Sequence, residues 1–304
     1  MISTIKITQD NDGRRLDRTL RSMFKWIALD EIMMSIRKGE VRVNTKRVRK
    51  HAFRVSAGDE LSVPWTLTDD GTHINTYNTW GNISVIFQGE NVLILNKPAG
   101  ILVQPNEYYG DSVISRVWGV LGTKTPAPAH RLDRNTTGVL TVALHGDALR
   151  SLEEVFRERT IRKFYRAIVT GKAPDTMIDA PLLKDPDSNT VTVSPDGLTA
   201  RTKCTCLASN EKFSLVELEL LTGRTHQARV HMAHIGHPIL GDRKYGDFDA
   251  NREKGDMVKR PLLHAYMLQF PEALPSCLDE VAGKKFSAPL PDDMQNFINA
   301  EELS

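Results

Sequence analysis

Apolar residues near the start of the chain recur at helical spacing in two short stretches. Residues 16–24 and 29–36 each place large apolar side chains three or four positions apart, which predicts two short helices. Gly39 is placed to end the second helix, because glycine readily adopts the left-handed conformation that follows many helices. Residues 41–44 then predict a strand that leads into a turn near Lys46.

From residue 83 onward the pattern changes to apolar runs and strand-like alternation. Val216, Leu218 and Leu220 alternate with glutamates, which is typical of a strand with one buried face. One helix stands out, with Asp147 as its expected N-cap and an apolar face that includes Leu152. The predicted strands cover residues 83–87, 92–97, 139–144, 164–169, 200–207 and 213–221.

This order of elements predicts the fold class and the domain organisation. Many strands with few helices between them favour an α+β fold with a mixed, mainly antiparallel central sheet and flanking helices. Residues 66–81 are rich in Thr, Asp, Asn and Gly without any period, so we expect an interdomain linker there. We therefore predict a small α/β module over residues 1–65 and a larger domain over residues 82–304.

Charge separates the same two parts of the chain. Residues 13–54 carry 13 basic and 4 acidic side chains, a net charge of +9, whereas the rest of the chain carries −7. This asymmetry indicates a nucleic-acid-binding module joined to a body that is not generally basic. The side chains that we expect to contact phosphates are Arg15, Arg18, Lys46, Arg47, Arg49 and Lys50.

Other bulk features favour a soluble cytoplasmic protein. Hydrophobic residues make up 40% and charged residues 26%, which is ordinary for a globular chain. The first ten residues do not resemble an export signal, and no apolar run approaches the roughly 18 residues that span a membrane. Cys204, Cys206 and Cys277 lack metal-ligand spacing, so we interpret them as reduced thiols.

The stretch of residues 130–138 carries the strongest chemical signal. Asp133 lies between Arg131 and Arg134, just before a small-residue turn and an alternating apolar run. A carboxylate held by positive charge at the mouth of a sheet is ionised, and it can act as a nucleophile or a base. A salt-bridged structural aspartate is the alternative. A kinase catalytic loop is disfavoured, because neither a glycine-rich phosphate loop nor a D-F-G sequence is present.

A second cluster occupies residues 222–231, where the glutamate-alternating strand ends. Arg224 follows Gly223 and could make a bidentate contact with a carboxylate from a neighbouring strand or with a phosphate. The histidines at 226, 231, 234 and 237 do not follow a zinc-binding spacing with a carboxylate. We therefore expect them to serve as caps, RNA contacts or core hydrogen-bonding groups, and we predict no metal site.

Two family resemblances follow from these motifs. Residues 13–63, with Arg15-Leu16-Asp17 and the run Lys38 to Asn44, resemble the S-four-like RNA-binding module. The sequence H-R-L-D-R-N-T-T-G at 130–138 resembles the signature of the RluA-type pseudouridine synthases. Matching motifs follow in order at residues 95–100, 163–171, 222–231, 237–242 and 263–265.

The resemblance implies a pseudouridine-synthase fold and an isomerase that needs no cofactor or metal. Asp133 matches the essential aspartate, and attack on the sugar, attack on the base and removal of a sugar proton all stay open as its role. Tyr165 matches the tyrosine that stacks on the target base, and Arg224 matches the arginine that pairs with the aspartate. Arg131 matches the residue that enters the RNA. The further expected contacts with RNA or substrate are His130, Arg134, Lys163, Gln227 and Arg229.

The expected partner is RNA, most of all large-subunit (23S) ribosomal RNA or a ribosome-assembly intermediate, and we expect a monomer. Two alternatives remain, a transfer-RNA-directed synthase and a catalytically inactive RNA-binding protein on the same fold. The chain departs from the family pattern at Thr137, where Ser is usual, and at Gln104, where His often follows the Lys-Pro turn. The first departure keeps a hydroxyl, whereas the second concerns the edge of the substrate pocket.

Overall fold

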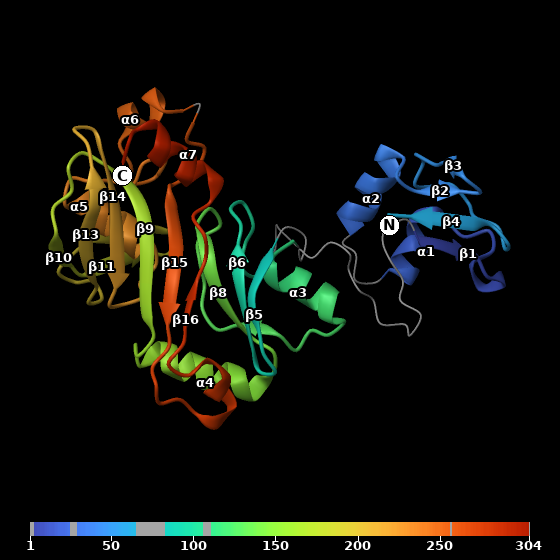
Figure 1. Ribbon diagram of the computed structural model, residues 1–304, viewed down its shortest axis with the longest axis horizontal. Helices are drawn as coiled ribbons and strands as arrows, with labels where there is room; N and C mark the ends of the chain where they lie inside the picture. The colour runs from blue at the N-terminus through green and yellow to red at the C-terminus, as the bar shows by residue number, and fades with distance from the viewer. Residues whose placement is uncertain (1–2, 25–28, 65–82, 106–110, 256, 304) are drawn as a thin grey trace. The chain divides into compact units, whose positions relative to one another are not determined.

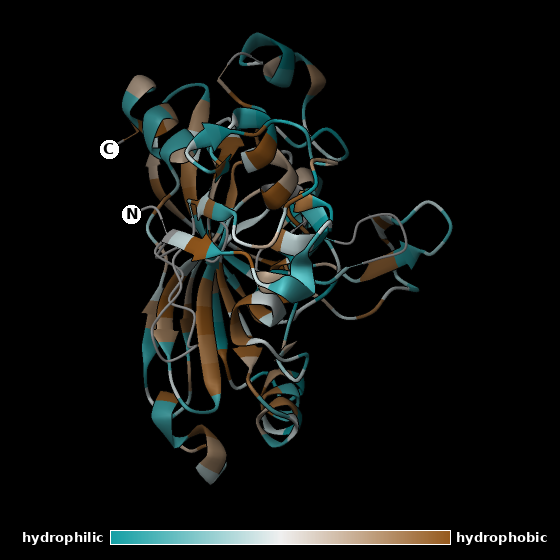
Figure 2. Ribbon diagram, turned by 90° about the vertical axis from the view of Figure 1, so that its right-hand side faces the viewer, coloured by the Kyte–Doolittle hydropathy of each residue, from teal (hydrophilic) through white to brown (hydrophobic). Residues whose placement is uncertain are grey.

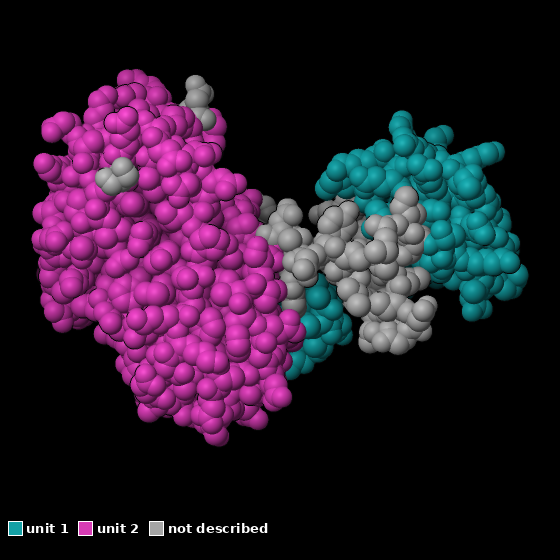
Figure 3. Space-filling view, in the orientation of Figure 1, with its two compact units in different colours: residues 1–82, 114–125 teal, residues 83–113, 126–304 magenta. Residues whose placement is uncertain are grey.

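The computed structural model describes residues 3–24, 29–64, 83–105, 111–255 and 257–303, so the predicted linker lies outside the described residues. Contacts divide the chain into two units, drawn in different colours in Figure 3. The first unit contains Met1–Asn82 and Ile114–Thr125, and the second contains Ile83–Val113 and Pro126–Ser304.

The first unit packs its helices on a small antiparallel sheet, as the helical spacing predicts. Leu16, Leu20 and Ile36 are fully buried in one apolar cluster with residues of the strands. Gly39 has a φ of +72° directly after the second helix, which is the conformation that its position required. The strand order is β1-β4-β2-β3. The elements are β1 (Ser3–Lys6), η1 (Gln9–Asn11), α1 (Leu16–Met23), α2 (Leu29–Lys38), β2 (Arg42–Val43), β3 (Lys46–Arg47) and β4 (Glu60–Val63). Helix α3 (Val113–Leu121) lies mostly within the residue ranges of this unit.

The second unit is built on a long mixed sheet with the order β10-β13-β14-β9-β15-β8-β6-β5 (Figure 1). Strand β16 adds to β15, and β7 adds to β8. Among the described strands only the β15–β8 pair is parallel, so the expected mixed, mainly antiparallel sheet is confirmed. The strands are β5 (Ser84–Gln88), β6 (Val92–Lys97), β7 (Ala127–Pro128), β8 (Thr137–Ala143), β9 (Arg162–Thr170), β10 (Thr176–Asp179), β13 (Arg201–Ser209), β14 (Phe213–Leu220), β15 (Leu263–Gln269) and β16 (Lys285–Ser287).

Alternation along the central strands assigns a different helix to each face of the sheet. Ala167 and Val216 share an apolar cluster with residues of α5 (Gln227–His234). Ile168 and Leu215, one position away, pack instead with residues of α7 (Asp292–Ala300). Because neighbouring side chains on a strand point to opposite faces, both faces of β9 and β14 are covered. Figure 2 shows the resulting concentration of apolar residues along the strands.

The other half of the sheet packs against α4 (Gly146–Arg157) and the short helix η2 (Ser276–Val281). The expected N-cap of α4 is wrong by two positions. His145 is the N-cap and accepts from the amide of Ala148, whereas Asp147 lies in the first turn. An acidic residue there still interacts favourably with the positive end of the helix dipole.

The polar excursion after residue 180 forms a hairpin that the periodicity did not indicate. Its strands β11 (Leu182–Asp185) and β12 (Thr190–Val193) make a separate two-stranded sheet. Helix α6 (Phe248–Glu253) was likewise not anticipated. None of the described helices is long and apolar enough to cross a membrane.

The parallel pairing of β8 with β15 depends on Gly138. This residue has a φ of +113° and pairs with Ala265, and a Cβ at this position would lie 2.1 Å from the Ala265 carbonyl oxygen. A side chain at 138 would therefore force β8 and β15 apart.

We expect Gly138→Ala to lower the free energy of unfolding by about 3 kcal/mol or more, because overcrowding and backbone strain each cost ~1–3 kcal/mol. Chemical denaturation measures the loss. Gly100→Ala is the control, because Gly100 also has a positive φ of +83° but has open space around its Cβ position. It should lose only about 1 kcal/mol from strain. Equal losses for the two variants would contradict the role given to the strand contact.

Candidate active site

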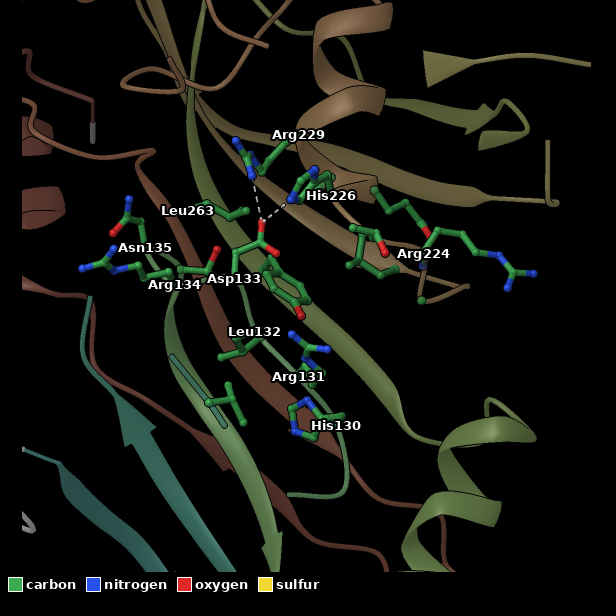
Figure 4. A pocket seen from close by; sticks show the side chains of 18 of the residues that line it. His130, Arg131, Leu132, Asp133, Arg134, Asn135, Arg224, His226, Arg229 and Leu263 are labelled. Atoms are coloured by element: carbon green, nitrogen blue, oxygen red, sulfur yellow. Dashed lines mark hydrogen bonds and ion pairs between the residues drawn. The ribbon is translucent and has the colours of Figure 1, made fainter. Parts of the chain in front are cut away.

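A cavity of about 900 Å³ in the second unit is lined by both of the charged clusters seen in the sequence (Figure 4). Its wall includes residues 130–136, just before β8, and residues 223–229, which run from the turn after β14 into the start of α5. Strand β9 adds Lys163 and Tyr165, which lie two positions apart and therefore on one face of the sheet.

Lys97 holds the loop that carries Asp133 through hydrogen bonds to backbone carbonyls. The Lys97 side chain is fully buried, and its Nζ donates to the carbonyls of Pro98, Arg134 and Thr136 at 2.9, 3.0 and 2.9 Å. Burial lowers the pKa of Lys97 to about 7, an effect that the nearby Asp133 opposes. All three donor positions are occupied by backbone carbonyls on or near the loop, so Lys97 fixes its path.

Lys97 lies in the matching motif at residues 95–100 but was not among the predicted site residues. The available signal was an apolar strand, Val92–Lys97, that ends in lysine directly before a Pro-Ala-Gly turn. A buried lysine at such a position must satisfy its three N–H groups locally, which is how this one behaves.

Asp133 is held by Arg229, which also binds a second and deeply buried carboxylate. Arg229 Nη1 lies 3.0 Å from Asp133 Oδ2, while Nε and Nη2 donate to the two oxygens of Asp242 at 2.6 and 2.8 Å. The side chain of Asp242 is only 1% exposed. Although burial opposes ionisation, the hydrogen bonds and charge of Arg229 keep the pKa of Asp242 below its usual value.

The prediction that Arg224 pairs with Asp133 was therefore wrong, because Arg229 makes that pair. Arg224 Nε donates to the carbonyl of Thr199 at 3.1 Å, and Figure 4 shows its guanidinium directed away from Asp133. Arg224 still lines the cavity. Arg229, expected to contact phosphate, is committed to two carboxylates instead.

The carboxylate of Asp133 has an anchored side and an open side. His226 Nε2 lies 3.8 Å from Oδ2, the same oxygen that Arg229 contacts. Among the described residues, no hydrogen bond or ion pair reaches Oδ1. The Asp133 side chain is 33% exposed and lines the cavity, and Oδ1 is its unpaired oxygen among the described residues.

The titrating groups of β9 are shifted by their surroundings. Burial and the negative charge of Asp133 raise the pKa of Tyr165 well above its usual range, so its hydroxyl stays protonated. Burial, with a smaller contribution from Arg159, lowers the pKa of Lys163. The cavity thus combines a carboxylate paired with Arg229, a neutral phenol and an amine in one pocket.

Two expected substrate contacts, His130 and Gln227, line the cavity and also bond to the protein's own groups. Gln227 is buried and its amide bonds to Thr222, Thr202 and backbone groups of Arg201 and Arg224, which fixes the turn into α5. His130 Nε2 accepts the amide N–H of Thr141, and its ring packs on Phe156 at 4.6 Å between centroids.

The neighbours of Asp133 in its loop are more open. Arg131 and Arg134 are exposed and line the cavity, although Arg134 Nε also donates to the carbonyl of Gly100. In the first unit, Arg18, Lys46, Arg47, Arg49 and Lys50 are exposed as expected. Arg15 is committed to a bidentate pair with Asp17 at 3.1 and 2.8 Å, so it is less available to phosphate.

Three of the four histidines of the second cluster bind separate partners, and the fourth is exposed. His231 is buried between Thr202 and the carbonyl of Ala180, and His237 contacts the carbonyl of Thr170. His226 contacts Tyr245, and His234 is exposed. Within the part of the chain that the structure describes, no three His, Cys, Asp or Glu side chains gather as a metal site would require.

Comparisons with known proteins agree with this arrangement. The sequence profile described as RNA pseudouridylate synthase matches residues 91–234, and that of the S4 domain matches residues 14–61. The chain is 35% identical to a ribosomal large subunit pseudouridine synthase C of Vibrio parahaemolyticus over 88% of both chains. The same name, identity and coverage apply to a relative from Escherichia coli strain K12. A solved structure, human RNA Pseudouridylate Synthase Domain Containing 4, superimposes with a TM-score of 0.59 at 25% identity, over 72% of this chain and 93% of that one.

The double ion pair of Arg229 gives a direct test of this geometry. Arg229→Met should lower the free energy of unfolding by about 3–5 kcal/mol at neutral pH, because it leaves Asp242 buried without a cation. Ionised Asp242 stabilises the native state above its ordinary pKa, and that stabilisation is lost as pH falls through its lowered native pKa. The difference between wild type and variant should therefore shrink below about pH 4.

Arg224→Met is the matched control and should change stability by no more than about 0.5 kcal/mol. Denaturation curves over a pH series measure both variants. A larger loss for Arg224→Met than for Arg229→Met would refute the assignment of Arg229 as the anchoring arginine.

Proposed function

This chain belongs to the family of RNA pseudouridylate synthases, and we propose that it isomerises specific uridines of large-subunit ribosomal RNA with Asp133 as its catalytic carboxylate. The observation that carries the proposal is the anchored carboxylate of Asp133, with one oxygen held by Arg229 and the other open to a cavity of about 900 Å³.

The reaction is an isomerisation without net change in atoms or electrons. The bond from the sugar carbon C1′ to uracil N1 breaks, the base turns, and a bond from C1′ to C5 forms. The proton leaves C5, and N1 gains one. Attack by Asp133 on the sugar or on the base and removal of a sugar proton all use an ionised oxygen, and we assign that oxygen as Oδ1. In this proposal no cofactor or metal takes part.

The target base must leave the RNA stack to reach this pocket, which costs a few kcal/mol. We propose that the ring of Tyr165, on the cavity wall, stacks on the extruded uracil and that Arg131, exposed beside Asp133, fills the space that the base vacates. The protonated state of the Tyr165 hydroxyl suits it to a late proton transfer at C5.

The first unit supports RNA as the partner. An S4 domain matches residues 14–61, and its exposed lysines and arginines suit contact with phosphates. The names of the relatives favour large-subunit ribosomal RNA over transfer RNA. We further propose that the chain acts as a monomer in the cytoplasm, where ribosomes assemble.

We expect Asp133→Asn to abolish turnover while leaving RNA binding nearly unchanged, because it removes the charge but keeps the shape of the side chain. Turnover is measured as tritium released from C5-labelled uridine in ribosomal RNA and should fall by at least about 10²–10⁴-fold. In cells whose only copy of the gene carries this change, pseudouridine mapping of total RNA should show sites missing from large-subunit ribosomal RNA.

Asp249→Asn is the control, because the Asp249 side chain is 80% exposed on α6 and does not line the cavity. It should retain full turnover and every pseudouridine. Tritium release persisting in the Asp133→Asn enzyme would overturn its catalytic role. Loss of pseudouridine from transfer RNA alone would overturn the substrate assignment.

The basic hairpin of the first unit should contribute to the salt dependence of RNA binding. Lys46 and Arg47 are the two exposed residues of β3. If both contact phosphates, Lys46→Gln/Arg47→Gln should reduce the slope of log K against log salt concentration by about 1.4–1.8. Filter binding of a ribosomal RNA fragment over a salt series measures the slope. The control Lys172→Gln/Lys285→Gln removes two exposed charges of the second unit that do not line the cavity, and its slope should match wild type. Identical slopes for all three proteins would refute phosphate contact by β3.

A further inference from the structure

His226 occupies a strained position beside the anchored oxygen of Asp133. It is the N-cap of α5 with a φ of +53°, in the left-handed region that costs a non-glycine residue on the order of 1 kcal/mol. Its side chain is 10% exposed, and Nε2 lies 3.8 Å from Asp133 Oδ2 (Figure 4). A strained backbone that places a buried ring against the candidate catalytic group indicates a role for that ring.

Tyr245 holds the other edge of the same imidazole. Its hydroxyl lies 2.8 Å from His226 Nδ1, and the two rings meet at 5.5 Å between centroids. The ring of Tyr245 also lies 5.0 Å from the guanidinium carbon of Arg229, and its amide N–H donates to Asp242. Tyr245 thus contacts the residues that fix Asp133 from two sides.

The hydrogen bonds around the Tyr245 hydroxyl determine the tautomer of His226. The amide N–H of Val191, on β12, can only donate, and it donates to the hydroxyl oxygen at 3.0 Å. The Tyr245 hydroxyl therefore donates its proton to His226 Nδ1. If Nδ1 carried a proton instead, it could not accept, and the hydroxyl proton would lose this acceptor. With Nδ1 accepting, the ring proton of neutral His226 lies on Nε2 and faces Asp133.

The surroundings of His226, above all its burial, favour a neutral ring at physiological pH. Burial is the largest effect and lowers its pKa, and the cations of Arg229 and Lys244 act in the same direction. Asp133 and Asp242 oppose them. A neutral ring leaves Arg229 as the cation that pairs with Asp133.

We propose that His226 is a positioning residue for Asp133, held by the Tyr245 hydroxyl as the Nε2–H tautomer. Nε2–H and Arg229 Nη1 both face Oδ2, so the carboxylate keeps this oxygen inward and presents Oδ1 to the substrate. The chain of contacts Val191, Tyr245, His226 and Asp133 also links the β11–β12 hairpin to the reacting group. This proposal rests on the catalytic role proposed for Asp133, but its structural part can be tested without RNA.

The decisive experiment is nitrogen NMR of the full chain labelled with ¹⁵N-histidine, at neutral pH, with His226 assigned from its absence in His226→Gln. We expect Nδ1 to resonate as an unprotonated acceptor and Nε2 as a protonated nitrogen. In Tyr245→Phe the ring should become a mixture of tautomers, while in the control Tyr266→Phe the spectrum of His226 should match wild type. A protonated Nδ1 in the wild-type protein would overturn the proposal, whatever the activity of Asp133→Asn.

Kinetics test the consequence for Asp133. Tyr245→Phe should lower kcat about tenfold, which corresponds to about 1.4 kcal/mol, with little change in KM. His226→Gln can place an amide N–H where Nε2–H lies, so its kcat should stay closer to wild type than that of His226→Asn, whose shorter side chain cannot reach. Unchanged kcat in Tyr245→Phe, or equal losses in the Gln and Asn variants, would overturn the positioning role. Abolished tritium release by Asp133→Asn in the same series would show that the proposed function itself stands.

Discussion

The geometry of this site depends on Arg229, which joins a partly exposed carboxylate to a buried one. Asp242 takes two of its N–H groups in a bidentate pair, and Asp133 takes a third. A bidentate pair fixes both the position and the plane of a guanidinium. Asp242 therefore fixes the position of the Arg229 guanidinium. Asp133 is oriented by a cation that is held in place independently of it.

This division separates positioning from chemistry. If Asp133 alone held Arg229, the same pair would have to orient the carboxylate and neutralise it. With Asp242 already compensating the buried charge of Arg229, Asp133 lines the cavity with one carboxylate oxygen unshared among the described residues. Lys97 serves the backbone in a similar way, because from a fully buried position it holds the carbonyls of Arg134 and Thr136, just after Asp133.

Periodicity predicted most strands of the sheet around the site, and motif resemblance pointed to Asp133 and to the family. The errors lie where tertiary contacts choose among similar residues. Arg224 and Arg229 stand five positions apart in one motif, and only the turn between them decides which reaches Asp133. That turn depends on the buried amide of Gln227 and on the left-handed backbone of His226, neither of which leaves a periodic signal. Likewise, a motif cannot show that the side chains of His130 and Gln227 bond to backbone groups of other residues in the chain.

Elements without periodicity were also missed, and they matter at the site. The β11–β12 hairpin lies in a Pro- and Asp-rich stretch, yet it supplies the Val191 amide that contacts Tyr245. Tyr245 itself lies in a turn and was not selected from the sequence.

The central claim is that Oδ1 of Asp133, with Oδ2 held by Arg229, is the oxygen that meets the target nucleotide. A crystal structure with an RNA that carries 5-fluorouridine at the modified position tests it most directly, because fluorine replaces the hydrogen on C5 and cannot leave as the proton does. The account predicts the base in the cavity against Tyr165, Oδ1 in contact with the nucleotide, and Oδ2 still paired with Arg229. A nucleotide bound in the cavity with Asp133 turned away, or with Arg229 released from it, would contradict the account.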